Sequence, residues 1–161
     1  MNSKVKRTAD VTHKIMSAVR SKNTKPEIML RKALWKLGLR YRLNCQKILG
    51  TPDIVFLRAK IAVFVDGDFW HGHNWAIRDY GSFEQEIKRY NPYWQDKIKR
   101  NIERDLEQTI ALRDEGWIVL RYWESDIKND TEAIAVQISE IYSARSENNE
   151  RRQPHDYFRK A

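Results

Sequence analysis

Acidic and imidazole side chains stand at the ends of two short apolar runs in the sequence. Asp53 directly precedes residues 54–57, and Asp66 directly follows residues 61–65, with His71 a few positions later. A carboxylate at the end of a buried strand is costly unless a cation or several hydrogen-bond donors meet it. Oxygen ligands suit Mg²⁺, which keeps bound waters and bridges to phosphate oxygens. The pattern therefore indicates metal-assisted phosphodiester hydrolysis, with His71 orienting or deprotonating the attacking water or protonating the leaving oxygen.

The two apolar runs also predict the elements that bring these side chains together. Residues 54–57 and 61–65 are rich in β-branched and aromatic residues, and only a short turn separates them, so we expect a β-hairpin. The first residue of one strand then lies near the last residue of its partner, which places Asp53 beside the Val65–Asp66 peptide. The nearly continuous apolar character of both runs predicts central, buried strands.

Simpler structural roles compete with chemistry at several of these positions. Asp53 follows a proline, a pair that is common in turns, and Glu27 completes a capping box with Thr24 at the start of a helix. His73 has an equally plain interpretation as a solvated side chain. The residue types alone leave both interpretations open.

The segment from residue 66 to residue 92 has neither helical nor strand periodicity, yet it contains many aromatic residues. Long irregular segments inside compact domains are usually functional or disordered, and the aromatic content argues against disorder. Phe69, Trp70 and the nearby Trp94 are therefore either core residues or side chains presented to a ligand.

Further elements surround the hairpin. They are a helix from Thr24 to Gly38, a weak strand over 40–43, a long helix over 93–115, a strand over 117–122 and a closing helix over 131–142. In the long helix, i, i+4 spacing predicts an apolar stripe that faces the core, formed by Ile98, Ile102, Leu106 and Ile110. The order of elements predicts an α/β fold in which a central mixed β-sheet is flanked by helices.

The length of 161 residues allows one domain, which we place at residues 1–143, with 1–12 expected to be flexible. Residues 144–161 are rich in charge and poor in aliphatic side chains, which predicts a mobile C-terminal tail. The sequence starts without a signal-like segment and contains no apolar run near the length of a membrane span, so we expect a cytoplasmic protein with no membrane contact.

Basic residues are concentrated in the first part of the chain. The net charge is +8, but residues 1–60 carry +12 and the remainder carries −4. This asymmetry indicates a polyanionic partner, and double-stranded DNA fits better than a membrane because the chain has no amphipathic basic helix. The single cysteine, Cys45, excludes an internal disulfide and any zinc site built from two or more thiolates.

Several sequence blocks occur in a recognisable order and spacing. They are KNTKPE (22–27), GLRYR (38–42), GTPDIVF (50–56), VFVDGDFWHGH (63–73), YWQDKIKRNIERD (93–105) and a final block from GW (116–117) to WE (123–124). Through these blocks the chain resembles the very short patch repair endonucleases over roughly residues 13–140. No single block carries the resemblance; the ordered set does.

The resemblance implies a restriction-endonuclease-like core and Mg²⁺-dependent cleavage of one DNA strand beside a T:G mismatch, with one or two metal ions. Asp53 matches the family's metal-binding aspartate, and the backbone carbonyl of Val65 matches a second metal ligand. His71 matches a catalytic histidine, and Glu27 matches a catalytic-site glutamate. Asp66 stands where the best-known members have a histidine, and we expect it to bind metal or to act as a base.

The resemblance also implies which residues contact DNA. Phe69, Trp70 and Trp94 match aromatic side chains that wedge into the base stack, and a mispaired step lowers the cost of such unstacking. The basic side chains that we expect on the phosphate backbone are Arg20, Lys22, Lys25, Lys97 and Arg100.

The sequence departs from the family at its structural zinc. The family's ligands are cysteines and histidines around the Phe-Trp-His segment and after the Trp-Glu pair, where this chain has no cysteine and carries Asp68, His73, Asn74, Trp75 and Ser125. We therefore expect no structural zinc, with a weaker metal at Asp68 and His73 as the alternative. The motif lysine of the wider nuclease superfamily is also missing, from the segment that contains Val65.

Three functions are compatible with these observations. The leading expectation is a monomeric endonuclease that nicks duplex DNA at or near a T:G mismatch, with mismatch-repair proteins as candidate partners. The first alternative is a restriction or phage-defence nuclease that cuts both strands as a dimer. The second is a DNA-binding protein without catalysis, suggested by the missing lysine, although the joint presence of Asp53, His71 and Glu27 argues against it.

Overall fold

A four-stranded mixed sheet forms the centre of the protein. The computed structural model describes residues 22–152. Its strands are β1 (Arg42–Leu43), β2 (Ile54–Phe56), β3 (Ile61–Asp66) and β4 (Ile118–Trp123), in the spatial order β1-β2-β3-β4. The first three strands pair antiparallel, whereas β3 and β4 pair parallel. The predicted hairpin and the mixed sheet are confirmed.

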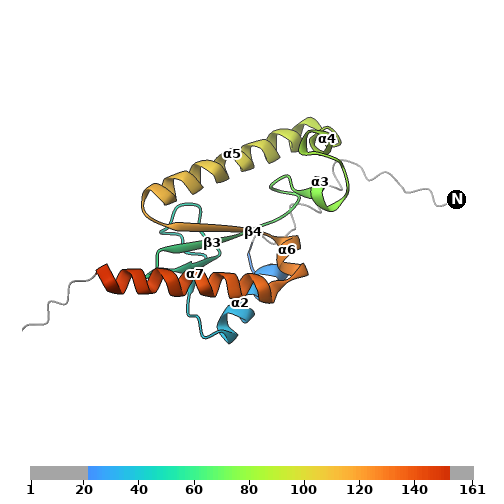
Figure 1. Ribbon diagram of the computed structural model, residues 1–161. Helices are drawn as coiled ribbons and strands as arrows, with labels where there is room; N and C mark the ends of the chain where they lie inside the picture. The colour runs from blue at the N-terminus through green and yellow to red at the C-terminus, as the bar shows by residue number, and fades with distance from the viewer. Residues whose placement is uncertain (1–21, 153–161) are drawn as a thin grey trace, which may run out of the picture.

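Helices cover both faces of the sheet, as predicted. They are α2 (Lys25–Lys36), α3 (Asn74–Ile77), α4 (Phe83–Ile87), α5 (Pro92–Asp114), α6 (Glu124–Asn129) and α7 (Thr131–Arg152). Helix α5 lies on one side of the sheet, and α2 and α7 lie on the other (Figure 1). Helix α5 is also the crossover that makes β3 and β4 parallel, because it carries the chain back to the end of the sheet where β3 began.

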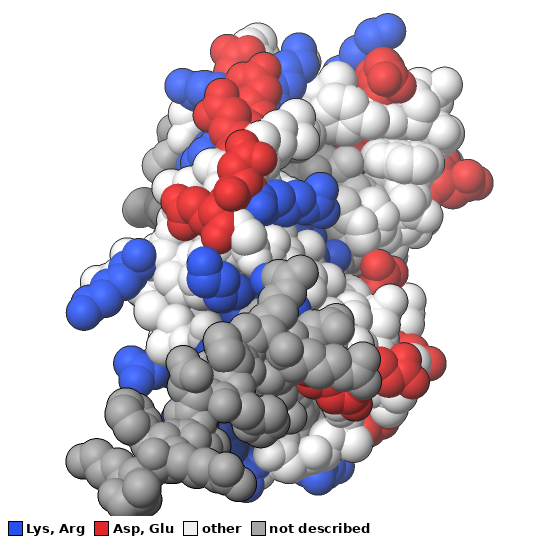
Figure 2. Space-filling model, turned by 60° about the vertical axis from the view of Figure 1, so that its left-hand side comes forward, with Lys and Arg blue, Asp and Glu red and all other residues white. Residues whose placement is uncertain are grey.

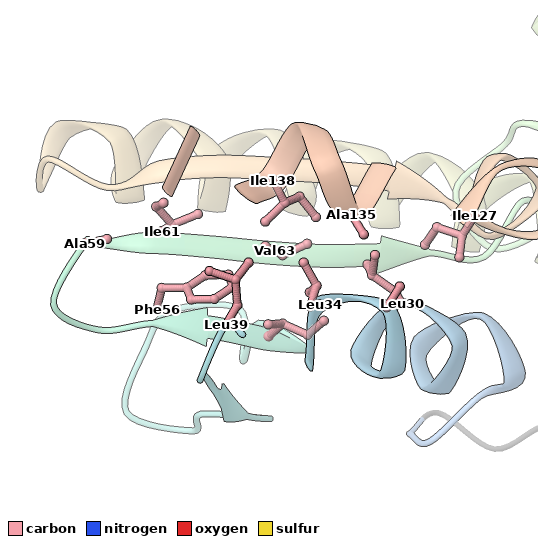
Figure 3. Packing of buried hydrophobic residues seen from close by; sticks show 12 residues of the cluster. Leu30, Leu34, Leu39, Phe56, Ala59, Ile61, Val63, Ile127, Ala135 and Ile138 are labelled. Atoms are coloured by element: carbon pink, nitrogen blue, oxygen red, sulfur yellow. The ribbon is translucent and has the colours of Figure 1, made fainter. Parts of the chain in front are cut away.

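The main hydrophobic core lies between the sheet and α2, α6 and α7. The cluster includes Leu30 and Leu34 of α2, Ile61 and Val63 of β3, and Ile138 of α7 (Figure 3). All five side chains are completely buried. Burial of a side chain of this size contributes roughly 1.5–3 kcal/mol, so this cluster fixes β3 in place. Strand β3 in turn positions the residues that follow it.

The opposite face of the sheet has a smaller core, and here one prediction was wrong. In α5, Ile98 is buried, but the exposed fractions of Ile102, Leu106 and Ile110 are 37%, 60% and 51%. Residues four apart advance by about 40° around a helix of 3.6 residues per turn, so a stripe built only of i+4 steps rotates away from its partner. The buried face instead continues from Ile98 to Leu112.

The predicted domain end at residue 143 lies inside α7, which continues to Arg152. Arg145 ties this extension to the sheet, because its Nε donates to the carbonyl oxygen of Ala59 at 3.2 Å and its Nη2 to that of Gly116 at 2.8 Å. Residues 1–21, which include the segment expected to be flexible and Arg20, lie outside the described residues, as do 153–161.

Among the helices of residues 22–152, none combines the length and the apolar character that a membrane span needs.

Candidate active site

Asp53 lies at the entrance to β2, beside the end of β3. The chain reaches it through Gly50 and Thr51, both in the left-handed region with φ of 76° and 52°. That conformation is strained for a β-branched threonine. The amide of Val65 donates to Asp53 Oδ2 at 2.8 Å. The predicted proximity of Asp53 to the Val65–Asp66 peptide is therefore confirmed for Val65.

The surroundings of Asp53 disfavour its negative charge. Burial raises the pKa of this carboxyl to about 6, helped by the nearby carboxylates of Glu27 and Asp66 and opposed by the Val65 amide and by Arg31. Within residues 22–152, only the Val65 amide donates a hydrogen bond to the Asp53 carboxylate. A half-buried carboxylate with one donor and acidic neighbours suits a hard divalent cation, which supplies the missing positive charge.

The raised pKa of Asp53 predicts a pH-dependent cost in stability. The folded protein favours the protonated carboxyl. The loss of stability therefore begins as the pH rises past the pKa of the unfolded chain, near 3.8, and is complete above the pKa of the folded protein, about 6. In metal-free buffer at about pH 8, the free energy of unfolding of Asp53→Asn, measured by urea denaturation, should therefore exceed that of the parent by about 1–3 kcal/mol. The difference should shrink towards zero at about pH 4. A parent protein as stable as the variant at high pH would contradict this account.

Glu27 is buried at the first turn of α2, and its carboxylate is fully engaged. It accepts from the backbone amides of Asn23 and Thr24 and from the Thr24 hydroxyl, at 3.0, 3.3 and 2.9 Å. Arg31 forms an ion pair with it at 2.7 Å and also donates to the Asn23 side chain. The predicted capping box is confirmed. Because Glu27 influences the pKa of Asp53, the structure also brings it to the site.

Asp66 ends β3, and Arg121 of the neighbouring strand β4 holds both of its oxygens. Arg121 Nε and Nη2 each donate to one Asp66 oxygen at 2.7 Å, a bidentate arrangement. The Nη2 atom also lies 3.3 Å from Asp105 Oδ2. Burial lowers the pKa of Arg121, but the two carboxylates outweigh burial and raise it above its usual range. Arg121 therefore stays charged inside the site.

His71 is paired with Asp105 from α5. Its Nδ1 forms a hydrogen bond with Asp105 Oδ2, and its Nε2 lies 3.9 Å from Asp66 Oδ1. Burial raises the pKa of Asp105, but the His71 hydrogen bond and the charges of His71 and Arg121 more than compensate, so it is lowered overall. A carboxylate on one ring nitrogen fixes the orientation of an imidazole and leaves the other nitrogen for proton transfer.

The three predicted wedge residues form one aromatic cluster beside this centre. Phe69, Trp70 and Trp94 have ring centroids 5.3–5.5 Å apart in edge-to-face contacts. Lys97 places its Nζ 5.3 Å from the Trp70 ring and 5.5 Å from the Trp94 ring. Asn101 Nδ2 donates to the backbone oxygen of Trp70 at 2.9 Å, so α5 fixes the loop that carries the cluster. The cluster unites aromatic faces and a cation.

The residues that the sequence resemblance placed at a zinc position form a hydrogen-bonded cluster. Asp68 Oδ1 contacts His73 Nδ1 at 2.9 Å and accepts from Ser125 Oγ at 2.8 Å. The His73 ring stacks on Trp123 with the centroids 4.1 Å apart. The predicted alternatives were an absent zinc and a weaker metal at Asp68 and His73. This donor set does not fit structural zinc, because it has no thiolate and its carboxylate and imidazole are bonded to each other.

We therefore predict that the purified protein contains less than about 0.1 zinc per chain by elemental analysis. Ser125→Ala should lower the free energy of unfolding by about 1 kcal/mol, because it removes one partly buried hydrogen bond. That loss should be the same with and without a chelator. Stoichiometric zinc, or a parent protein that the chelator destabilises, would refute the prediction.

The predicted phosphate-contacting residues are more widely spread. Lys22, Lys25 and Arg100 are exposed, Lys97 lies over the aromatic cluster, and Arg20 lies outside the described residues. On the face shown in Figure 2, acidic side chains gather in a ridge at the upper left and basic side chains are scattered. Five of the fifteen Lys and Arg in residues 1–60 precede residue 22, so a third of that basic excess falls outside the described part.

Two residues of the site were missed by the sequence analysis. Asp105 looked like an ordinary charged position on a helix, and Arg121 looked like a polar position in a strand. A helical period drawn through Trp94 and Ile98, both buried, would have placed Asp105 on the inward face of α5. No local pattern pointed to Arg121, since its contact depends on how β4 pairs with β3.

A mixed sheet between helices, with carboxylates and an imidazole gathered at one edge, is the arrangement of a restriction-endonuclease-like nuclease. A family model described as DNA mismatch endonuclease Vsr matches residues 5–77. The chain belongs to the Vsr family of DNA mismatch endonucleases, and it is a DNA endonuclease. The sequence resemblance is confirmed.

Relatives from three bacteria align with most of the chain. The type II nicking enzyme V.NmeDIP of Neisseria meningitidis serogroup C is 47% identical over 131 residues, which cover 81% of this chain and 85% of that protein. The type II nicking enzyme V.HpaIIP of Haemophilus parainfluenzae is 43% identical, with 83% and 92% covered. DNA mismatch endonuclease Vsr of Escherichia coli K12 is 31% identical, with 71% and 70% covered.

Proposed function

We propose that this endonuclease nicks one strand of double-stranded DNA at or near a T:G mismatch, as a monomer in the cytoplasm and with Mg²⁺ as its cofactor. The observation that carries the proposal is the half-buried Asp53 carboxylate, whose pKa is raised and whose single hydrogen-bond donor among the described residues is the Val65 amide. The names of the relatives, nicking enzymes and a mismatch endonuclease, support nicking rather than cleavage of both strands.

In this proposal Asp53 and the carbonyl oxygen of Val65 hold the metal, which when bound polarises the phosphate and activates water. His71 transfers the proton at its Nε2 atom, while Asp105 keeps the ring oriented through Nδ1. Glu27 adds negative charge next to Asp53 from its capped position. The half-buried site limits access of bulk water, which strengthens these electrostatic effects.

The aromatic cluster provides the physical route to mismatch preference. A wedge between base pairs must disrupt stacking, which costs a few kcal/mol per step and less where the bases are mispaired. Phe69 and Trp70 are partly exposed and supported by the buried Trp94, so they fit a wedge on a rigid base. Lys97 above the rings adds a cation for the adjacent phosphate.

The function is tested with a library of duplexes in which a T:G or T:A pair stands between randomised flanks. We expect Mg²⁺-dependent breaks in one strand only, enriched beside T:G, and sequencing of the cut ends gives the flanking preference. Omission of Mg²⁺ or addition of EDTA is the control. Breaks in both strands at one sequence would support the restriction alternative, and binding without breaks would support the inactive alternative.

Trp70→Ala should reduce the preference for mismatched over paired duplex by about tenfold, and it should reduce DNA affinity less. The reason is that the remaining basic residues still bind the backbone, whereas the wedge is truncated. Trp35→Ala is the matched control, because Trp35 is 55% exposed and lies on α2, away from the aromatic cluster. Equal discrimination by both variants and the parent, measured as the ratio of cleavage rates, would remove the wedge hypothesis.

A further inference from the structure

One group of side chains near the site has the composition of a second metal site. Ligand atoms of Asp66, His71 and Asp105 all lie within 4.8 Å of one another, and no other such group occurs in residues 22–152. They come from the end of β3, the loop after it and the middle of α5. Two carboxylates and an imidazole at this spacing are suitable ligands for a divalent cation.

Arg121 already occupies the centre of this group. Two of its nitrogens each contact an Asp66 oxygen at 2.7 Å, and Nη2 also lies 3.3 Å from Asp105 Oδ2. Its Nη1 reaches the backbone oxygen of Asp105 at 3.5 Å. One guanidinium therefore touches two of the three potential ligands. Both oxygens of Asp66 are taken up by it.

The sheet holds Arg121 in this position. In the parallel pairing of β3 and β4, Arg121 lies opposite Phe64, and its guanidinium stacks over the Phe64 ring at 4.7 Å. From there it extends to Asp66, two residues further along β3. The strand register, the packing on the Phe64 ring and the bidentate ion pair all hold the Arg121 guanidinium at the same place, so its positive charge is preorganised.

We propose that the Arg121 guanidinium takes the place that a metal ion would otherwise occupy among Asp66, His71 and Asp105, so that the divalent cation binds at Asp53 and not in this group. The proposal rests on the proposed function, which supplies the ion at Asp53. A second cation at Asp66 would meet a fixed positive charge and no free oxygen. Arg121 neutralises Asp66 and Asp105 instead, and through Asp105 it positions His71, so it is a positioning residue.

The test counts bound ions rather than turnover. Mn²⁺ is titrated into the metal-free protein, and the free ion is measured by electron paramagnetic resonance. The parent protein should bind one ion, Asp53→Ala none, and Arg121→Ala one more than the parent, because Asp66, His71 and Asp105 are then released. Arg104→Ala is the matched control: Arg104 also contacts Asp105, at 3.2 Å, but its side chain is 54% exposed, and its loss should leave the count unchanged.

The results separate the two proposals. An Arg121→Ala count equal to that of the parent overturns the present inference but leaves the function intact. A parent count that Asp53→Ala does not lower overturns the metal site of the proposed function. A second variant covers the case in which Arg121→Ala fails to fold. The Mn²⁺ dissociation constant of Asp66→Asn should lie within about threefold of that of the parent. A dissociation constant tenfold or more above that of the parent would make Asp66 a ligand and refute the inference.

Discussion

Asp53→Ala is expected to slow strand cleavage by at least about a thousandfold, the largest effect of any single substitution in this protein. Asp53 is the only carboxylate of the site with a single hydrogen-bond donor and no ion pair within residues 22–152, whereas arginines hold Glu27, Asp66 and Asp105. Its removal takes away the one negative group left for the metal. Single-turnover cleavage of a labelled duplex at saturating enzyme measures the loss.

DNA binding should survive this substitution, because the residues that we expect to contact phosphate are basic side chains elsewhere. Fluorescence anisotropy in the absence of Mg²⁺ should give a dissociation constant within about threefold of the parent. Asp114→Ala is a suitable control, since Asp114 is an exposed aspartate at the last turn of α5, and it should cleave at the normal rate. An Asp53→Ala protein that still cleaves normally would remove the basis of the proposed mechanism.

His71→Ala should lower the cleavage rate by about a hundredfold to ten-thousandfold, the usual contribution of a positioned acid or base. Asp105→Asn should cost less, because it leaves the imidazole in place and removes only the charge that orients it. Single-turnover cleavage of a labelled duplex measures both rates. An Asp105→Asn loss larger than that of His71→Ala would contradict this order.

The two residues should act as one unit. The double variant His71→Ala, Asp105→Asn should cleave no more slowly than His71→Ala alone, because Asp105 acts through the ring that is already missing. Thermal unfolding of all three variants controls for loss of structure. Multiplicative losses in the double variant would show that Asp105 contributes independently of His71, which would refute the pairing described here.

The part of the site that depends on local structure was predictable from the sequence. A turn between two apolar runs is sufficient to place Asp53 beside Val65, and the capping box that anchors Glu27 lies within four consecutive residues. Local signals fix both arrangements, whatever the rest of the fold does. The mixed sheet followed from the same hairpin and from the long helical crossover after it.

The part that depends on long-range geometry was not predictable in this way. The rotation of α5 decides whether Asp105 or Leu106 faces the sheet, and the i, i+4 stripe gave the wrong answer. The pairing of Arg121 with Asp66 depends on the parallel register of β4, which no short motif specifies. The candidate site thus depends partly on local and partly on tertiary structure, and the tertiary part supplies the Arg121 guanidinium and the oriented His71 imidazole.

The hydrogen bonds that join Asp68, His73 and Ser125 anchor the loop after β3 without using a cysteine or a metal ion. A cysteine cluster is lost when its sulfurs are oxidised or its ion is withdrawn, whereas a carboxylate, an imidazole and a hydroxyl are not substrates for the same oxidants. Peroxide stress or scarcity of zinc in the growth medium should leave this attachment, and the aromatic side chains next to it, in working order.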